Sequence, residues 1–480
     1  KHILRCRSFL SVLRAASQLT VQVNNGCPTW LLGTLNIMKT INLPLDSALR
    51  DRSFLFGTAT SSFQIEGAAD SRLKSIWDTF CEQEGKIADK SDGLIACEHV
   101  ARFKEDVDLL QEMGVDAYRF SISWPRVMQQ NGELNPQGVQ FYIDLLDELA
   151  SRGIQAFATL YHWDLPQYLE DLGGWLNRDT AYAFQQYVEK ITQALGTRVQ
   201  AYATFNEPFC SAYLGYEIGV HAPGKTGRKQ GRTAAHHILL AHGLGMQALR
   251  EHAPHAKNGI VLNFTPCYPV SETPADQLAT IYADEYINQW YMQPVMEGSY
   301  PPVLEKLAPE DKPDIQPGDM EIICQPLDFL GVNFYTRLTY SAAETKGELY
   351  TEHAHREPKT DIGWEIYPQA FYDLLTSLNA RYDLPPIYIT ENGAAMADKL
   401  VNGEVADNDR IDYYEAHLCA LSDAIDAGVN VAGYFAWSLM DNFEWAEGYV
   451  KRFGLVYVDF ETQTRLFKHS AHAYKLLLAQ

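Results

Sequence analysis

The sequence lacks the cysteine patterns that staple small secreted domains or bind zinc. Its eight cysteines lie far apart, with no C-x-x-C pair and no regular spacing. Disulfide frameworks and structural zinc sites both need such patterns. We therefore predict reduced thiols, a cytoplasmic location, and no bound metal or other cofactor. The cysteines are Cys6, Cys27, Cys81, Cys97, Cys210, Cys267, Cys324 and Cys419.

Positive charge is also scarce. The chain has 39 Lys and Arg against 61 Asp and Glu, which gives a formal net charge of −22. Nucleic acids and anionic membrane surfaces would repel such a chain, so we expect neither as a partner. The uncharged stretch 15–38 is interrupted by Gln18, Gln22, Asn24, Asn25 and Pro28. These polar residues argue against a membrane span, and a neutral or cationic ligand is the easier fit.

Acidic residues are missing from the first 45 residues, which contain five Lys or Arg. Two explanations remain open. In the first, which we favour, Met38 is the true start and the preceding residues come from upstream sequence. In the second, the arginine-rich start is a targeting peptide. In either case we predict a poorly ordered extension over residues 1–45 and a single domain over residues 46–480.

Internal repeats and low-complexity segments are absent, but a strand-then-helix pattern recurs along the chain. Helical periodicity begins near residues 99, 136, 180, 232, 274, 368, 410 and 468. Alternating strands and helices predict a parallel sheet, and eight such units are the number that closes a (β/α)8 TIM barrel. The eight expected strands are 54–60, 117–123, 156–161, 201–206, 259–263, 329–335, 386–390 and 431–437.

The second of these helices is the best marked. Asn135 is placed to cap it, Pro136 suits its first turn, and an apolar stripe follows at helical spacing. The polar stretches 67–98 and 341–361 read as long strand-to-helix loops. In this fold such loops cover the C-terminal mouth of the barrel, where active sites are built.

Two glutamates occupy matching positions at the ends of predicted strands. Glu207 closes the fourth strand in the segment 204–208, and Glu391 closes the seventh in the segment 388–393. Two carboxylates on separate strand ends are the minimum equipment for breaking a glycosidic bond. Only a fold that unites distant strands allows them to cooperate.

Polar and aromatic residues end most of the other predicted strands. A sugar needs hydrogen-bond partners for its hydroxyl groups and a flat apolar surface for the C–H face of its ring. The chain offers both kinds. Gln64, His162, Asn206 and Glu444 are expected to bind hydroxyls, and Trp163, Trp437, Trp445 and Phe453 to supply apolar surface.

These motifs, taken in order, resemble a β-glucosidase of glycoside hydrolase family 1. The resemblance covers roughly residue 55 to the C-terminus. A lone Asn-Glu-Pro would be weak, but an ordered set on consecutive strands is very specific. Besides the two glutamate segments, the set comprises residues 56–60, 64–67, 118–124, 161–166, 437–445 and 452–455.

The resemblance implies a retaining mechanism in two displacement steps. Glu391 would attack the anomeric carbon, and Glu207 would protonate the leaving oxygen and then deprotonate the incoming water. Arg119 and the Tyr335 hydroxyl would keep Glu391 ionised, while burial and the charge of Glu391 would keep Glu207 protonated. The two carboxyl groups should lie about 5–5.5 Å apart. Asn333, at the end of the sixth strand, is expected in the same site.

The resemblance also assigns the sugar-binding positions. Gln64, His162, Asn206, Glu444 and Trp445 would bind the glycone, with Asn206 on the 2-hydroxyl. Trp437 would form the floor, and Trp364 a platform for the aglycone. Expected substrates are β-glucosides and short cello-oligosaccharides, with some β-galactosides or β-fucosides, for a monomer or homo-oligomer. Glu444 and Glu447 would repel a phosphate dianion, so unphosphorylated substrates are expected.

Two other functions stay open at this point. A carbohydrate-binding protein could keep the pocket and lose catalysis, although both glutamates are present. A transglycosidase would use an acceptor sugar in place of water. His236, His237, His252 and His255 look like a metal cluster at first sight, but they fall on the fourth predicted helix, away from the mouth. We read them as surface or packing residues.

Overall fold

The computed structural model describes residues 39–480. The expected poorly ordered extension therefore lies almost wholly outside the described residues, and only its last seven residues can be compared. Ile41 and Leu43 are buried, and the backbone N–H of Asn42 donates to Glu415 Oε2 at 2.7 Å. The boundary at residue 45 is thus wrong for residues 39–45, because a lack of acids says nothing about whether alternate apolar residues pack.

Eight parallel strands form a closed barrel in the order β1-β11-β10-β7-β5-β4-β3-β2, and β1 pairs with both β11 and β2. The predicted (β/α)8 TIM barrel is confirmed. The barrel strands are β1 (Leu55–Ala59), β2 (Ala117–Ser121), β3 (Gln155–Thr159), β4 (Ala201–Asn206), β5 (Lys257–Phe264), β7 (Phe329–Phe334), β10 (Ile387–Asn392) and β11 (Val431–Trp437).

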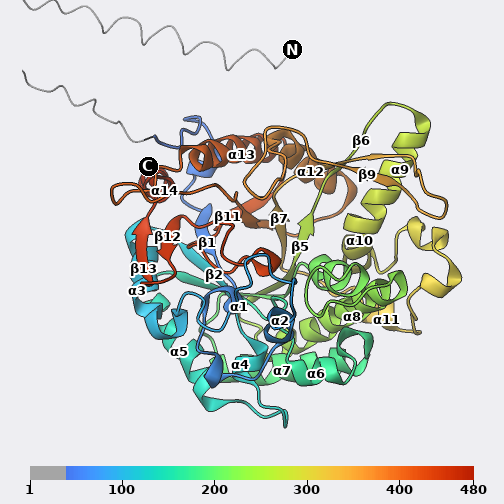
Figure 1. Cartoon of the computed structure of the whole chain (residues 1–480), viewed down its shortest axis with the longest axis horizontal. Helices are drawn as coiled ribbons and strands as arrows, with labels where there is room; N and C mark the ends of the chain where they lie inside the picture. Colours follow the sequence, from blue (N-terminus) through green and yellow to red (C-terminus); the bar gives the residue numbers. More distant parts are fainter. Residues whose placement is uncertain (1–38) are drawn as a thin grey trace, which may run out of the picture. The chain divides into compact units, whose positions relative to one another are not determined.

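Helices surround these strands (Figure 1). In the best-marked helix, the Asn135 side chain accepts a hydrogen bond from the N–H of Gln137, and the apolar stripe faces the core. The outer helices are α3 (His99–Met113), α5 (Pro136–Ser151), α7 (Asp179–Leu195), α8 (Arg228–His252), α9 (Pro274–Asp284), α10 (Trp290–Glu297), α12 (Pro368–Arg381), α13 (Asn408–Asp426) and α14 (His469–Leu478).

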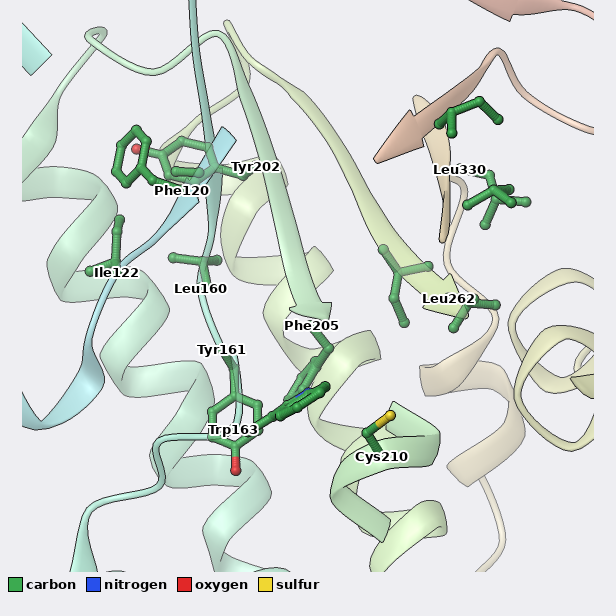
Figure 2. Close-up of a cluster of buried hydrophobic side chains, with 14 of the residues drawn as sticks. Phe120, Ile122, Leu160, Tyr161, Trp163, Tyr202, Phe205, Cys210, Leu262 and Leu330 are labelled. Carbon is green, nitrogen blue, oxygen red and sulfur yellow. The ribbon is translucent and has the colours of Figure 1, made fainter. Parts of the chain in front are cut away.

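The core has two layers. Inside the barrel, Phe157 packs against Tyr388 and Phe435 with ring centroids 5.2 and 5.0 Å apart. The larger layer lies between the strands and the helices, and Figure 2 shows part of it, including Tyr202 and Leu262. Filling the barrel interior with side chains makes it a packed core, so a ligand site has to form at its mouth.

Short elements elaborate the loops between strands and helices. The stretch 341–361, predicted as a loop, contains a short strand that pairs antiparallel with β8. The remaining short helices and strands are α1 (Ser62–Ile65), α2 (Ile76–Cys81), α4 (Trp124–Val127), α6 (Gln167–Asp171), α11 (Asp319–Ile323), the π-helices η4 (Cys210–Glu217) and η5 (Glu285–Gln289), β6 (Cys267–Pro269), β8 (Leu338–Ser341), β9 (Thr351–His353), β12 (Val456–Asp459) and β13 (Thr464–Phe467). The 3-10 helices are η1 (Ala48–Arg50), η2 (Ala69–Ser71), η3 (Gly174–Leu176), η6 (Pro302–Lys306), η7 (Pro309–Asp311) and η8 (Trp445–Glu447).

Register irregularities mark the ends of the two strands that carry the paired glutamates. The β4–β5 register shifts between Ala203 and Asn206, and the β10–β7 register shifts between Ile389 and Glu391. At the end of β4, Thr204 bonds to His242 of α8, and its neighbour Phe205 also packs outward. A bulge re-aims the following side chains. It therefore turns Asn206 toward the mouth.

None of the helices within residues 39–480 has the length and hydropathy of a transmembrane span. Cys81, Cys97, Cys210, Cys267 and Cys324 are free thiols. Two of the clustered histidines on α8 are packing residues: His236 contacts Tyr300 and Asp319, and His237 contacts the carbonyl of Trp175. Cys6 and Cys27 lie outside the described residues.

Candidate active site

A cavity of about 550 Å³ opens at the C-terminal ends of the barrel strands and contains both glutamates. This volume suits a small organic ligand. Among the predicted site residues, those that line it are Glu207, Glu391, Asn333, Tyr335, His162, Trp163, Trp364, Trp437, Glu444, Trp445 and Phe453.

One chain of hydrogen bonds joins the two glutamates. Arg119 donates through Nη1 to Glu391 Oε1 and through Nη2 to Asn206 Oδ1, at 2.6 Å in both cases. Asn333 Nδ2 donates to Asn206 Oδ1 at 3.1 Å and to Glu207 Oε1 at 2.7 Å. Residues from β2, β4, β7 and β10 thus hold the two carboxyl groups in one rigid unit.

Glu391 is surrounded by donors. Besides Arg119, the Tyr335 hydroxyl donates to Glu391 Oε2 at 2.6 Å, and the carboxyl group is almost fully buried. Burial and the neighbouring charge of Glu391 raise the pKa of Tyr335 well above its ordinary value, so Tyr335 keeps its proton and stays a donor. Both carboxylate oxygens of Glu391 therefore accept a strong hydrogen bond, and one of the two donors is a cation.

Glu207 has the opposite setting. Burial, reinforced by the charge of Glu391, raises the pKa of Glu207 from 4.5 to about 8. Its direct partners, Asn333 and the Cys210 thiol, are both neutral. Near neutral pH, Glu207 therefore carries a proton that it can give to a ligand. The two carboxyl groups of one cavity therefore have unlike surroundings: Glu391 bonds to a cation, and Glu207 bonds only to neutral groups.

Strained backbone accompanies three residues of the cavity wall. Glu207, Trp163 and Trp445 have φ values of 46°, 75° and 49°. A left-handed conformation in a non-glycine residue costs free energy of order 1–3 kcal/mol and persists only where the surroundings enforce it. Its presence at three positions of one cavity indicates that side-chain direction there matters more than local stability.

His162 presents a hydrogen-bond donor to the cavity. Asn206 Oδ1 accepts from Arg119 and Asn333, which fixes the amide so that Nδ2 faces His162 Nε2 at 3.1 Å. His162 Nε2 is then the acceptor and Nδ1 carries the proton. Burial and nearby Arg119 lower the pKa of His162 well below its ordinary value, so the ring is neutral. Among the described residues, Nδ1 has no partner.

Glu444 offers a second polar atom without a protein partner. Burial, followed by the charge of Glu391, raises the pKa of Glu444 to about 8, and its Oε2 has no partner among residues 39–480. Gln64 supports the loop that carries it, since Gln64 Nε2 donates to Asn442 Oδ1 and to the Phe443 carbonyl at 2.9 and 2.8 Å. Unpartnered buried polar atoms facing a cavity suit a ligand rich in hydroxyl groups.

Aromatic rings make up most of the remaining wall. Trp445 packs against Trp163 with centroids 4.5 Å apart, and Trp437 lies nearly parallel to His162 at 5.9 Å. On the other side, Trp364 packs against Tyr335 and Phe453. The cavity therefore combines flat apolar faces with a few convergent polar groups, as a sugar-binding site requires.

The structure places three of the predicted residues behind the wall. Gln64, Arg119 and Asn206 are buried and hydrogen-bonded within the protein, while Glu207, Asn333 and the other predicted residues reach the cavity. Direct contact of Gln64 and Asn206 with a sugar stays a prediction.

Sequence reasoning missed several wall residues. Cys210 and Tyr213 follow Glu207 by three and six positions, so proximity to the glutamate motif was an available signal. Glu352 and His355 come from the stretch 341–361, whose position over the mouth was expected but whose individual residues carried no motif.

No described residue lining the cavity is Lys or Arg, and residues 39–480 contain no group of three or more His, Cys, Asp or Glu placed to hold a metal ion. The carboxyl groups thus meet a ligand without a cation beside them on the wall. Arg119 compensates Glu391 from behind.

A TIM barrel with two carboxyl groups in one cavity at its mouth has the arrangement of a glycosidase site. The chain matches the model of glycosyl hydrolase family 1 over residues 48–480, and it belongs to that family. A β-glucosidase from an Agrobacterium species is 47% identical over 431 residues, which cover 88% of this chain and 94% of the relative.

Two further relatives bear on substrates. A bifunctional β-D-glucosidase/β-D-fucosidase from Bifidobacterium breve is 42% identical, over 89% of this chain and 98% of the relative. The structure of virulence factor SghA from Agrobacterium tumefaciens, in complex with its substrate analogue salicin, superposes with a TM-score of 0.87. That protein is 46% identical, over 89% of this chain and 95% of the other.

Proposed function

We propose that the protein is a retaining β-glucosidase that removes terminal, non-reducing β-D-glucosyl residues. The observation that carries this proposal is the opposite setting of Glu207 and Glu391 within one cavity. Glu391 accepts hydrogen bonds from Arg119 and Tyr335, at 2.6 Å each, whereas burial raises the pKa of Glu207 to about 8.

In the first step, Glu391 attacks the anomeric carbon and the bond to the leaving oxygen breaks. Glu207 gives its proton to that oxygen, so the aglycone leaves as a neutral alcohol. The glucosyl unit remains as an ester of Glu391, and the charge of Glu391 disappears. Removing that charge lowers the proton affinity of Glu207, which then exists as a base.

In the second step, Glu207 takes a proton from a water molecule while the water oxygen attacks the anomeric carbon. The ester bond breaks, Glu391 regains its charge and Glu207 regains its proton. Two inversions give a β-configured product. An acceptor sugar in place of water gives transglycosylation by the same route.

The polar wall supports the choice of glycone. His162 Nδ1–H and Glu444 Oε2 have no hydrogen-bond partner among residues 39–480, and both suit ring hydroxyls. The cavity wall carries carboxyl groups and, in the part of the chain that the structure describes, no Lys or Arg. This disfavours a 6-phosphate, so we propose unphosphorylated substrates. Short cello-oligosaccharides fit a cavity of this kind, and by analogy with the Bifidobacterium relative we include β-D-fucosides. A role in cellulose breakdown and a cytoplasmic location complete the proposal.

Hydrolysis of p-nitrophenyl β-D-glucoside, followed by NMR of the first-formed glucose, tests the proposal. We expect β-glucose before mutarotation, with activity falling as the pH rises past about 8, because Glu207 then loses the proton that it must donate. First-formed α-glucose would exclude retention. Sugar binding without turnover would favour a carbohydrate-binding protein.

A 2-deoxy-2-fluoro glucoside with a good leaving group tests the nucleophile directly. It should stall the enzyme as a glycosyl ester, and peptide mass mapping should place the added mass on Glu391. Labelling of Glu207 instead would reverse the two assignments.

A further inference from the structure

Glu207 has one neighbour that the two-carboxylate scheme leaves unused, the thiol of Cys210. Cys210 Sγ lies 3.1 Å from Glu207 Oε2, and the side chain is buried in the cavity wall. This inference rests on the proposed function, because it assigns Cys210 a role through the acid/base residue.

The backbone places the thiol there by a tight local turn. The N–H of Cys210 donates to the carbonyl of Glu207 at 2.9 Å, and Cys210 is the first residue of the π-helix η4. Figure 2 shows Cys210 on this helical segment, beyond the strand that ends near Phe205. The sulfur therefore stays beside the carboxyl group without help from a distant element.

Cys210 acts as a hydrogen-bond donor. Burial, together with the charge of Glu207, raises the pKa of the thiol well above its ordinary value. The sulfur thus keeps its proton over the working pH range, and Glu207 Oε2 accepts. A thiol is a weak donor compared with a hydroxyl group.

The other oxygen of Glu207 is already committed. Thr390 Oγ1 donates to Asn333 Oδ1 at 2.6 Å, which orients the Asn333 amide so that its Nδ2 donates to Glu207 Oε1 at 2.7 Å. The proton of the acid form therefore belongs on Oε2, the oxygen beside the thiol. A hydrogen bond to that oxygen favours the carboxylate over the acid, and its strength sets how readily Oε2 is protonated.

We propose that Cys210 is a positioning residue for Glu207. Its weak S–H donor fixes the rotation of the carboxyl group and holds the proton affinity of Oε2 at the level that both steps of the reaction need. A stronger donor would keep Glu207 ionised and impair its action as an acid. Loss of the donor would raise the proton affinity of Glu207 and let its carboxyl group rotate more freely.

The pH profile of kcat/KM on phenyl β-D-glucoside tests this role with three variants. Cys210→Ser, a stronger donor, should move the alkaline limb to lower pH by about half a unit to one unit. Cys210→Ala and Cys210→Val, which have no donor, should move it to higher pH. Cys324→Ser and Cys324→Ala, at a half-buried thiol outside the cavity wall, are the matched controls and should leave the limb in place.

A second substrate separates a changed proton affinity of Glu207 from a general loss of structure. 2,4-Dinitrophenyl β-D-glucoside has a leaving group that needs no protonation, so its kcat/KM should respond much less in every Cys210 variant. Equal losses on both substrates with an unmoved limb would overturn the proposal, as would shifts of the same sign for serine and alanine. If the serine variant does not fold, an unmoved limb in both the alanine and valine variants also overturns it.

The proposed function fails separately from this inference. It fails if the wild-type enzyme turns over neither substrate, or if Glu207→Ala retains full activity on phenyl glucoside. The role of Cys210 fails when the wild-type enzyme has its alkaline limb and the Cys210 variants keep the same one.

Discussion

Two buried clusters of charge in this barrel differ in their balance. The mouth cluster consists of Glu207, Glu391 and Glu444 with a single cation, Arg119. The anchor cluster consists of Asp398, Asp407 and Asp441 with Lys468, Arg410 and Arg452. The side chains of both clusters are buried, except that Glu444 and Arg452 are partly exposed. In the first the carboxyl groups outnumber the cations, and in the second every carboxyl group has a cation beside it.

In the anchor cluster, pairing prevails over burial. Lys468 Nζ donates to Asp441 Oδ1 at 2.6 Å and to Asp398 Oδ2 at 2.5 Å, and Arg410 also donates to Asp398. Burial alone would raise the pKa of Asp398, but the charges of Arg410 and Lys468 outweigh it and lower the pKa. Asp441 lies in the segment 437–445, so the cluster fixes the loop that carries Trp437, Glu444 and Trp445.

In the mouth cluster, burial prevails. The pKa values of Glu207 and Glu444 rise to about 8, because burial and the nearby negative charge of Glu391 both oppose ionisation, and Arg119 bonds to Glu391 and not to either of them. The comparison teaches that balance distinguishes the two roles. A buried cluster with equal numbers of acids and cations keeps fixed protonation states and has a structural role. A buried cluster with excess acids holds a proton that it can transfer, and it has a chemical role.

The largest effect should come from Glu391→Gln. The amide cannot attack the anomeric carbon, so kcat/KM on p-nitrophenyl β-D-glucoside should fall at least about 10⁴-fold. Steady-state kinetics measure the loss, and Glu415→Gln, on α13, is the matched control and should retain activity. A fall of less than tenfold would mean that Glu391 is not the nucleophile, and the contrast between the two clusters would then fail.

Glu207→Ala should cost roughly 10²–10⁴-fold on a glucoside with a poor leaving group, which is the range that general acid–base catalysis supplies. Added azide should restore turnover on an activated aryl glucoside and give the β-azide, because attack on the glycosyl ester then needs no base. NMR identifies the anomer. An α-azide from this variant would mean that residue 207 is the nucleophile.

Lys468→Met should mainly affect stability. It leaves Asp398 and Asp441 short of a cation in a buried site, and breaking a buried pair in this way costs about 3–5 kcal/mol. Urea unfolding measures the loss. Lys475→Met removes an exposed ion pair with Glu112 and should cost no more than about 1 kcal/mol. An equal loss of unfolding free energy in the two variants would show that charge balance in the anchor cluster does not stabilise the fold.

The sequence could predict the barrel and the two glutamates at its mouth, but not the charge balance of the two clusters. The strand count, the cap at Asn135 and the two strand-end glutamates follow from periodicity and position, so the barrel and the pairing of Glu207 with Glu391 at one mouth were accessible. The anchor cluster was not. Asp398, Asp407 and Lys468 lie on separate loops and a helix end, and nothing local predicts that they meet.

Two other features also depended on tertiary structure. The bulge at the end of β4 overrides the alternation of side chains, so the directions of Phe205 and Asn206 could not be taken from a period of two. The supporting position of Gln64 follows from the approach of the loop at Asn442, which lies 378 residues further along the chain. Composition likewise misjudged residues 39–45, where Ile41 and Leu43 are buried and Asn42 bonds to Glu415 of α13.

The smallest expected effect is the loss of folding stability that comes from burying Glu444 without a cation beside it. Below its ordinary pKa of 4.5 the carboxyl group is protonated in both the folded and the unfolded chain, and it contributes nothing to pH dependence. Between pH 4.5 and about 8 the unfolded chain releases the proton while the folded chain keeps it, so stability falls as the pH rises. Glu444→Gln removes this term. The melting temperature of this variant should match that of the wild type near pH 4.5 and exceed it increasingly toward pH 8. The corresponding gain in unfolding free energy at pH 8 should be on the order of 1–3 kcal/mol. Thermal melts at several pH values measure the difference, with the exposed Glu84→Gln as control. A difference that stays constant with pH, or a slope as large in the control, would show that the mouth cluster retains Glu444 at no cost in stability, and the contrast with the anchor would then rest on chemistry alone.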